Sequence, residues 1–140
     1  MRAGKSRKVE LMRKVPLFSK LSRKHLQEVA GVADEIDLPS GKKLTKEGER
    51  GREFFVLLEG TADVHQEGKR IRTLGEGDFL GEIALVTKLP RTATVTTTSP
   101  VRALVITERD FSALLKRSPE IGQGVLEALG ERLAPHLPHH

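Results

Sequence analysis

Hydrophobic positions follow different rhythms along the chain, and these rhythms divide it into three regions. The first region, residues 6 to 33, has apolar residues at helical spacing. Ser6 is placed to cap a first helix, which Pro16 interrupts, and Ser22 is placed to cap a second helix. The apolar positions of these two helices are Val9, Met12 and Val15, then Leu26, Val29, Ala30 and Ala33.

The middle region, residues 34 to 107, alternates between turn signals and short strand-like runs. The turn signals lie at residues 39–41, 48–51, 67–68 and 75–77. The strand-like runs are residues 35–38, 43–46, 54–58, 62–66, 70–74, 93–98 and 101–106. The run FFVLL at residues 54–58 is apolar at every position, which predicts a strand buried on both faces. Short strands at spacings of about 8–12 residues predict a sandwich or a barrel.

The last region returns to helical spacing. Thr107 is placed to cap a helix, Pro119 to open another, and Pro135 to end that one. Their apolar positions are Phe111, Leu114 and Leu115, then Val125, Leu126, Leu129 and Leu133. The fold class is therefore mainly β with flanking α: an antiparallel β-roll or jelly-roll with N-terminal and C-terminal helices.

Composition narrows the picture to one globular domain without cysteine chemistry. A length of 140 residues suits a single domain. The chain has no cysteine, which excludes disulfides and thiolate metal sites. It has no window of about 18 apolar residues, so no membrane span is expected. The first residues lack the apolar core of a secretory signal, so a cytoplasmic location is the default expectation.

The net charge of +5 comes from basic residues near the start of the chain. They are Arg2, Lys5, Arg7, Lys8, Arg13, Lys14, Lys20, Arg23 and Lys24. A nucleic-acid interface needs a docking element as well, and no helix-turn-helix or RNA-binding signature accompanies this group. Solvated helical faces are the favoured interpretation, although a basic surface still attracts an anionic ligand or an acidic partner.

One stretch, residues 79–95, breaks the strand rhythm and combines the features that a phosphate needs. Gly81 permits a close backbone approach, and residues 83–85 can form one helical turn whose amides face an anion. Arg91 supplies a planar bidentate donor. Thr92 adds a hydroxyl, and Ala93 is small enough to leave its own amide uncovered.

Glu82 is informative because a carboxylate repels phosphate. Beside an anion site it makes sense as the acceptor of a hydrogen bond from a neighbouring sugar hydroxyl, the chemistry that dinucleotide sites use on ribose. Phosphate and ribose together indicate a nucleotide.

This stretch resembles the phosphate-binding cassette of the cyclic-nucleotide-binding domain family, whose members include cAMP receptor proteins, protein kinase regulatory subunits and cyclic-nucleotide-gated channels. The matching segments are GEIAL at residues 81–85 and PRTATV at residues 90–95. Gly60, the GDF of residues 77–79 and the VPLF of residues 15–18 are similar to further landmarks of the family. The resemblance spans residues 15 to 134, which leaves a basic helical extension at residues 1–14 and a tail, expected to be disordered, at residues 135–140.

The resemblance also implies roles for individual residues. Glu82 would hold the ribose 2′-hydroxyl and Arg91 the cyclic phosphate. The amides of Ile83, Ala84 and Ala93 would surround the phosphate oxygens, with Gly81 admitting the phosphate to the backbone. Thr92, Val64 and Leu74 would contact the base. Arg72 would stack on it, and Arg132 or Leu133 of the last helix would cover it.

The resulting hypothesis is a sensor of cAMP or cGMP that is not an enzyme and that repositions its C-terminal helices. The ligand is cAMP or cGMP, and Thr92 does not decide between them. The effector protein or domain is unknown, and a homodimer through the terminal helices is consistent with the resemblance.

Alternatives stay open. The chain can be the regulatory fragment of a cAMP-receptor-type transcription regulator, channel or kinase, or a β-roll that only pairs with proteins. A cupin-like metal enzyme is disfavoured because only His65 of the five histidines lies in the strand region, and no G-x-S-x-G elbow occurs.

Overall fold

The computed structural model describes residues 4–133, and within them the helices flank a central block of strands. The first helices are α1 (Lys5–Arg13), the 3₁₀ helix η1 (Pro16–Phe18) and α2 (Arg23–Gly31). The last helices are α3 (Glu108–Arg117) and α4 (Pro119–Leu133), and a short 3₁₀ helix, η2 (Glu82–Leu85), interrupts the strands. The strands are β1 (Asp34–Leu38), β2 (Lys43–Thr45), β3 (Glu53–Glu59), β4 (Ala62–Gln66), β5 (Lys69–Leu74), β6 (Phe79–Leu80), β7 (Thr94–Thr97) and β8 (Val101–Thr107).

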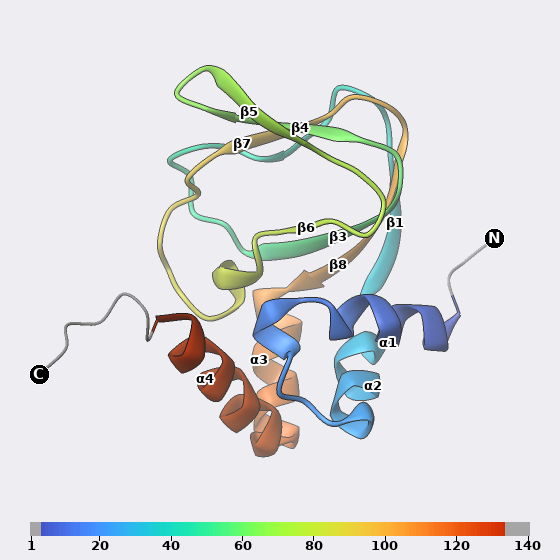
Figure 1. The fold of residues 1–140 in the computed structure, drawn as a ribbon, viewed down its shortest axis with the longest axis vertical. Helices are drawn as coiled ribbons and strands as arrows, with labels where there is room; N and C mark the ends of the chain where they lie inside the picture. Colours follow the sequence, from blue (N-terminus) through green and yellow to red (C-terminus); the bar gives the residue numbers. More distant parts are fainter. Residues whose placement is uncertain (1–3, 134–140) are drawn as a thin grey trace, which may run out of the picture.

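The strands form two antiparallel sheets of four, ordered β1-β8-β3-β6 and β2-β7-β4-β5. Figure 1 shows the two sheets facing each other above the helices, which cover the outer face of the β1-β8-β3-β6 sheet. This arrangement is the predicted antiparallel β-roll with flanking helices, and the predicted fold class is confirmed.

Strand β3 contributes side chains to both hydrophobic cores because both of its faces are buried. Phe54, Val56 and Leu58 point into the core shared with the helices, which also contains Phe18 and Phe111. The intervening residues of the strand, Phe55 and Leu57, point into the core between the two sheets. None of the five residues from Phe54 to Leu58 is more than 4% exposed, as the unbroken apolar run predicted.

Two of the three predicted helix caps are confirmed. The Ser22 hydroxyl accepts a hydrogen bond from the His25 N–H at 3.2 Å, and the Thr107 hydroxyl accepts one from the Asp110 N–H at 3.1 Å. The prediction for Ser6 is wrong: the N-cap of α1 is Gly4, two residues earlier, and it makes no side-chain hydrogen bond. The first turn already closes there, because the Lys8 N–H donates to the Gly4 carbonyl at 3.1 Å.

Helix α4 buries a narrower face than its sequence suggests. Ile121, Val125 and Ala128 are buried, whereas Leu126 is 69% exposed. Leu126 lies beside the stripe that Ile121, Val125 and Ala128 form at helical spacing, so it points away from the core. The predicted helix end at Pro135 lies outside the described residues. Within residues 4–133, no helix combines the length and apolar character that a membrane crossing requires.

Candidate functional site

A sharp turn between β6 and η2 forms the floor of the candidate site. Gly81 has φ 82° and ψ 15°, in the left-handed region that glycine adopts without strain. The turn directs the chain from the sheet into η2, where the Ala84 N–H donates to the Gly81 carbonyl at 3.0 Å. Residues 82–85 therefore form the single helical turn that the sequence predicted.

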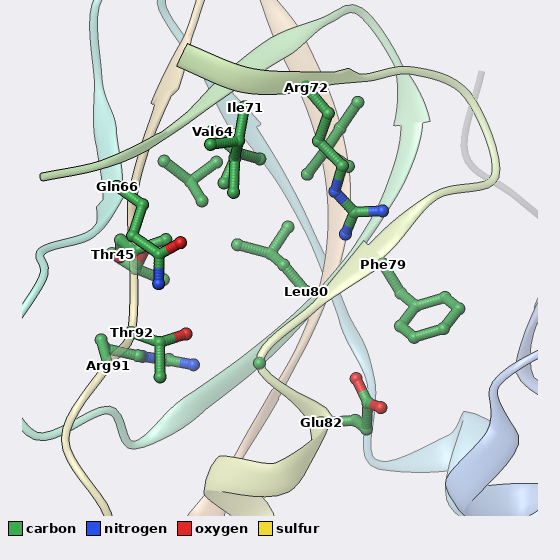
Figure 2. A pocket seen from close by; sticks show the side chains of 14 residues that line it. Thr45, Val64, Gln66, Ile71, Arg72, Phe79, Leu80, Glu82, Arg91 and Thr92 are labelled. Carbon is green, nitrogen blue, oxygen red and sulfur yellow. Dashed lines mark hydrogen bonds between the residues drawn. The ribbon is translucent and has the colours of Figure 1, made fainter. Parts of the chain in front are cut away.

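This floor opens into a cavity of about 510 Å³ between the two sheets, within the size range of small-molecule sites. It is lined by Thr45, Val64, Gln66, Ile71, Arg72, Leu74, Phe79, Leu80, Gly81, Glu82, Arg91, Thr92, Ala93 and Val95. Figure 2 shows Arg91 and Glu82 entering from opposite sides, with Arg72 hanging from the strand above them. The lining thus carries two guanidinium groups, one carboxylate and an apolar wall.

Arg91 is held in place by backbone contacts with the loop that precedes β3. Its N–H donates to the Glu49 carbonyl at 2.8 Å, and its carbonyl accepts from the Gly48 N–H at 2.9 Å. The guanidinium Nη2 donates to the Glu53 carbonyl at 2.5 Å. Partial burial lowers the pKa of Arg91, which the charge of Glu53 partly offsets, but an arginine stays protonated at physiological pH. The cavity therefore contains a permanent, half-desolvated cation.

Glu82 contributes the single carboxylate of the cavity, although its side chain is attached to a buried segment. It is the first residue of η2 and only 7% exposed. A carboxylate at the first position of a helical turn is favoured by the amides there, and buried carboxylates need hydrogen-bond donors. Its place in the wall puts it on the surface that a molecule bound in the cavity would contact.

The roof of the cavity comes from the hairpin β4–β5. Val64 and Leu74 are both buried, with 6% and 2% of their surfaces exposed, and supply apolar walls. Figure 2 shows the Arg72 side chain extending from the roof toward the floor. Val64 and His65 are consecutive in β4 but pair with Arg72 and Arg70 in β5, so Ile71 is the extra residue of a β-bulge.

Most of the residues that the sequence singled out meet at this cavity. Gly81, Glu82, Arg91, Thr92, Ala93, Val64, Leu74 and Arg72 all line it. Ile83 and Ala84 line an adjoining cavity of about 280 Å³, which shares Gly81, Glu82, Arg91 and Thr92 with the first. Arg132, and the alternative Leu133, lie at the end of α4, where the side chains are outside the described part of the structure.

Sequence reasoning missed six lining residues: Thr45, Gln66, Ile71, Phe79, Leu80 and Val95. Gln66 and Val95 could have been found by alternation, because Gln66 shares a strand face with Val64, and Val95 follows Ala93 by two residues. Ile71 could not, because the bulge places it beside Arg72 against the alternation. Strand β6 was missed as well, since two residues show no periodicity.

The described residues contain no cluster of candidate metal ligands. Nowhere in residues 4–133 do three or more histidine, aspartate or glutamate side chains gather in a cluster able to hold a metal ion. The polar chemistry of the cavity is instead that of Arg91, Arg72 and Glu82, which match an anion carrying a hydroxyl donor.

A β-roll whose cavity combines two guanidinium groups, one carboxylate and an apolar wall has the composition expected of a nucleotide-binding module. The comparison with family models agrees: the model described as "Cyclic nucleotide-binding domain" matches residues 35–118. The chain belongs to the cyclic nucleotide-binding domain family, which confirms the resemblance drawn from the cassette.

Relatives of this chain occur in different kinds of protein. A cyclic nucleotide-gated potassium channel from Rhizobium etli is 34% identical over 123 residues, covering 88% of this chain and 34% of the channel. The N-terminal domain of a transcriptional regulator from Streptomyces coelicolor A3(2) has a similar structure, with a TM-score of 0.80, 29% identity and coverage of 90% of this chain and 92% of that domain. The regulatory domain of Toxoplasma gondii PKA, solved with cAMP, has a TM-score of 0.70 and 27% identity over 79% of this chain and 44% of that one. The chain spans about a third of the length of the channel it matches.

Proposed function

We propose that the cavity binds a 3′,5′-cyclic nucleotide, with Arg91 on the cyclic phosphate and Glu82 on the ribose. The observation that carries this proposal is that both side chains line one cavity from opposite sides. In a 3′,5′-cyclic nucleotide both ester oxygens of the ribose are used, so the 2′-hydroxyl is the one hydroxyl left to donate. One carboxylate and one guanidinium therefore complement the charged and polar parts of such a ligand.

The ligand we propose is cAMP, with cGMP as its competitor. The PKA regulatory domain with a similar fold was solved with cAMP, which supports this choice. Val64 and Leu74 would contact the base from the roof, Arg72 would stack on it, and Thr92 would lie between base and phosphate. The Arg72 guanidinium has hydrogen-bond donors and no acceptor. The substituents of the purine ring would therefore decide how favourably Arg72 interacts with adenine or guanine.

The backbone of the cassette would complete the phosphate site. The amides of Ile83, Ala84 and Ala93 are the proposed donors, and Gly81 leaves room for the phosphate beside them. Because the Ala84 N–H already donates to the Gly81 carbonyl at 3.0 Å, the phosphate would share or replace this bond. Binding would then tighten or rearrange η2.

The same short helix offers a route from ligand to helices. Leu85, three residues after Glu82, is 4% exposed and belongs to the core that the helices share with β3. We propose that the ligand acts as a regulatory signal and is not transformed, and that movement of η2 repositions α3 and α4, bringing Arg132 or Leu133 over the base. The effector would be a channel, kinase or transcription-regulator domain in the cytoplasm, in a homodimer if the terminal helices pair.

Calorimetric titration of the wild-type protein with cAMP and with cGMP tests the ligand. Replacing Arg91 by alanine is expected to weaken binding by about 2–5 kcal/mol, because it removes a charge-assisted partner from a desolvated phosphate. Arg117→Ala, on the exposed side of α3, is the matched control and should leave the affinity unchanged. Equal binding by wild type and Arg91→Ala would remove Arg91 from the phosphate site, and no binding of either nucleotide by the wild type would end the proposal.

A further inference from the structure

The Arg91 side chain passes between two glycines that are thirty residues apart in the sequence. Gly51 lies in the loop before β3, and Gly81 lies in the turn after β6. Segments 48–50 and 90–91 run antiparallel, joined by the two backbone hydrogen bonds of Arg91 and by an isolated bridge between Arg50 and Pro90. Gly51 follows this pairing directly, so the start of the Arg91 side chain is brought against it.

The space between these glycines leaves no room for a side chain on either. A Cβ atom at Gly51 would lie 1.9 Å from Nε, 2.2 Å from Cζ and 2.7 Å from Cδ of Arg91. A Cβ atom at Gly81 would lie 2.2 Å from Nη1 of Arg91 and 2.9 Å from the Glu53 carbonyl oxygen. All of these separations are far below van der Waals contact, and the atoms met at Gly51 are in the middle of the guanidinium rather than at a free end.

The reason for a glycine at position 51 differs from the reason at most other glycines of the strand region. Positive φ angles occur at Gly41, Gly48, Gly60, Gly68, Gly77 and Gly81. Gly51 is not among them, so a left-handed backbone is not the reason for a glycine at this position. It is buried, and the space beside it is filled by Arg91. A glycine is thus needed at position 51 because the Arg91 guanidinium occupies the space that a side chain would fill.

We infer that Gly51 is a positioning residue that sets where the Arg91 guanidinium stands in the cavity. On one side the guanidinium is stopped by the Gly51 backbone, on the other by Gly81, and the Glu53 carbonyl fixes its rotation through Nη2. A methyl group at Gly51 pushes the guanidinium off this position and away from the Glu53 carbonyl. The consequence for ligand affinity rests on the proposed phosphate role of Arg91.

The test is a double-mutant cycle with two readouts. In the ligand-free protein, Gly51→Ala should lower the Tm by about 3–8 °C, because the methyl group overpacks a buried slot. In an Arg91→Ala background the slot is empty, so the same substitution should lower the Tm by less than about 1 °C. Gly75→Ala is the control: this glycine has no positive φ and nothing within 4 Å of an added Cβ.

The second readout is the affinity for cAMP and cGMP. Gly51→Ala should weaken the binding of whichever nucleotide the wild type binds by about tenfold or more, and should add less than about twofold in the Arg91→Ala background. The inference is overturned if Gly51→Ala has the stability and affinity of the wild type. It is also overturned if the loss of Tm or affinity caused by Gly51→Ala persists in the Arg91→Ala background. A wild-type protein that binds neither nucleotide contradicts the proposed function instead, and the Tm cycle still decides whether Gly51 acts through Arg91.

Discussion

Two charged side chains in the cavity differ in how the fold holds them. Glu82 is fixed because it opens a helical turn in a buried segment, with 7% of its surface exposed. Arg91 is half-buried and is fixed by contact with glycine backbone and by one carbonyl oxygen. The position of the carboxylate is therefore set by local secondary structure, whereas the position of the cation depends on loops that are distant in sequence.

The role of Glu82 can be tested with a change in the ligand. In the wild-type protein, 2′-deoxy-cAMP should bind about 10- to 100-fold more weakly than cAMP, because the carboxylate loses a charge-assisted hydrogen bond and stays desolvated. In Glu82→Gln the two ligands should differ by much less, since the charge is gone. Titration calorimetry of both proteins with both ligands measures this coupling.

Glu127→Gln, on the exposed face of α4, serves as the control and should retain the wild-type preference for the 2′-hydroxyl. If Glu82→Gln also retains that preference, the ribose is held by another group.

Helix η2 belongs to two environments although it has only four residues. Its first residue, Glu82, lines the cavity, and its last residue, Leu85, packs into the core shared with the helices. In the proposed mechanism, a displacement of Glu82 by the ligand would move Leu85 at the other end of this short helix, and through it the helices.

Two leucines four residues apart allow the packing of this segment to be measured. Leu85 is 4% exposed, whereas Leu89 in the following loop is 68% exposed. Leu85→Ala should lower the free energy of unfolding by about 2–4 kcal/mol, because it leaves a cavity against β3 and the helices. Leu89→Ala should change it by less than about 0.5 kcal/mol. Denaturant titration of the two variants makes the comparison, and equal effects would mean that η2 is not anchored through Leu85.

The sequence was sufficient for elements whose signal is local. The Ser22 and Thr107 caps, the buried run of β3 and the helical turn after Gly81 are each encoded within a few neighbouring residues, and each was predicted. Features that arise only from pairing were not. The bulge that turns Ile71 into the cavity depends on the register between β4 and β5, and β6 exists only because Phe79 and Leu80 pair with Val56 and Phe55.

The candidate site divides in the same way. The residues at positions 81 to 93 form a contiguous motif, so their gathering at one cavity could be predicted. Thr45 reaches that cavity from β2, where its hydroxyl donates to the Ala93 carbonyl at 3.0 Å. The contact of Gly51 with Arg91 joins segments 40 residues apart, and no local pattern signals it.

The protein is built as two cores on either side of one sheet, and the candidate cavity lies against the core between the sheets. The core between the sheets contains Val64, Leu74, Leu80 and Val95, which also line the cavity. The core on the helix side begins at Leu85, one helical turn away. Under the proposed mechanism, a ligand in this cavity would act on the inter-sheet core directly and on the helices through η2.

Hydrogen exchange can follow this action across the chain. Saturation with cAMP should slow amide exchange in residues 81–93, where the ligand is proposed to sit, and also in α3 and α4 if the helices are repositioned. Strand β1, which lines no part of the cavity, provides an internal reference that should not change. Slowing confined to residues 81–93 would show that ligand binding does not reach the helices. The Arg91→Ala protein should respond in neither region at the same cAMP concentration.

The roof and the floor of the cavity differ in what a mutation there would cost the fold. Strand β5 is the edge of its sheet, and every residue in it except Leu74 is exposed. Substitutions at Ile71 or Arg72 therefore leave the cores intact, while Glu82 and the Arg91 slot tolerate little. Under the proposed binding mode, a domain of this design could be retuned to a different base through the hairpin β4–β5 while the contacts to sugar and phosphate stay unchanged, which would make β5 the natural place to randomise when engineering biosensors from it.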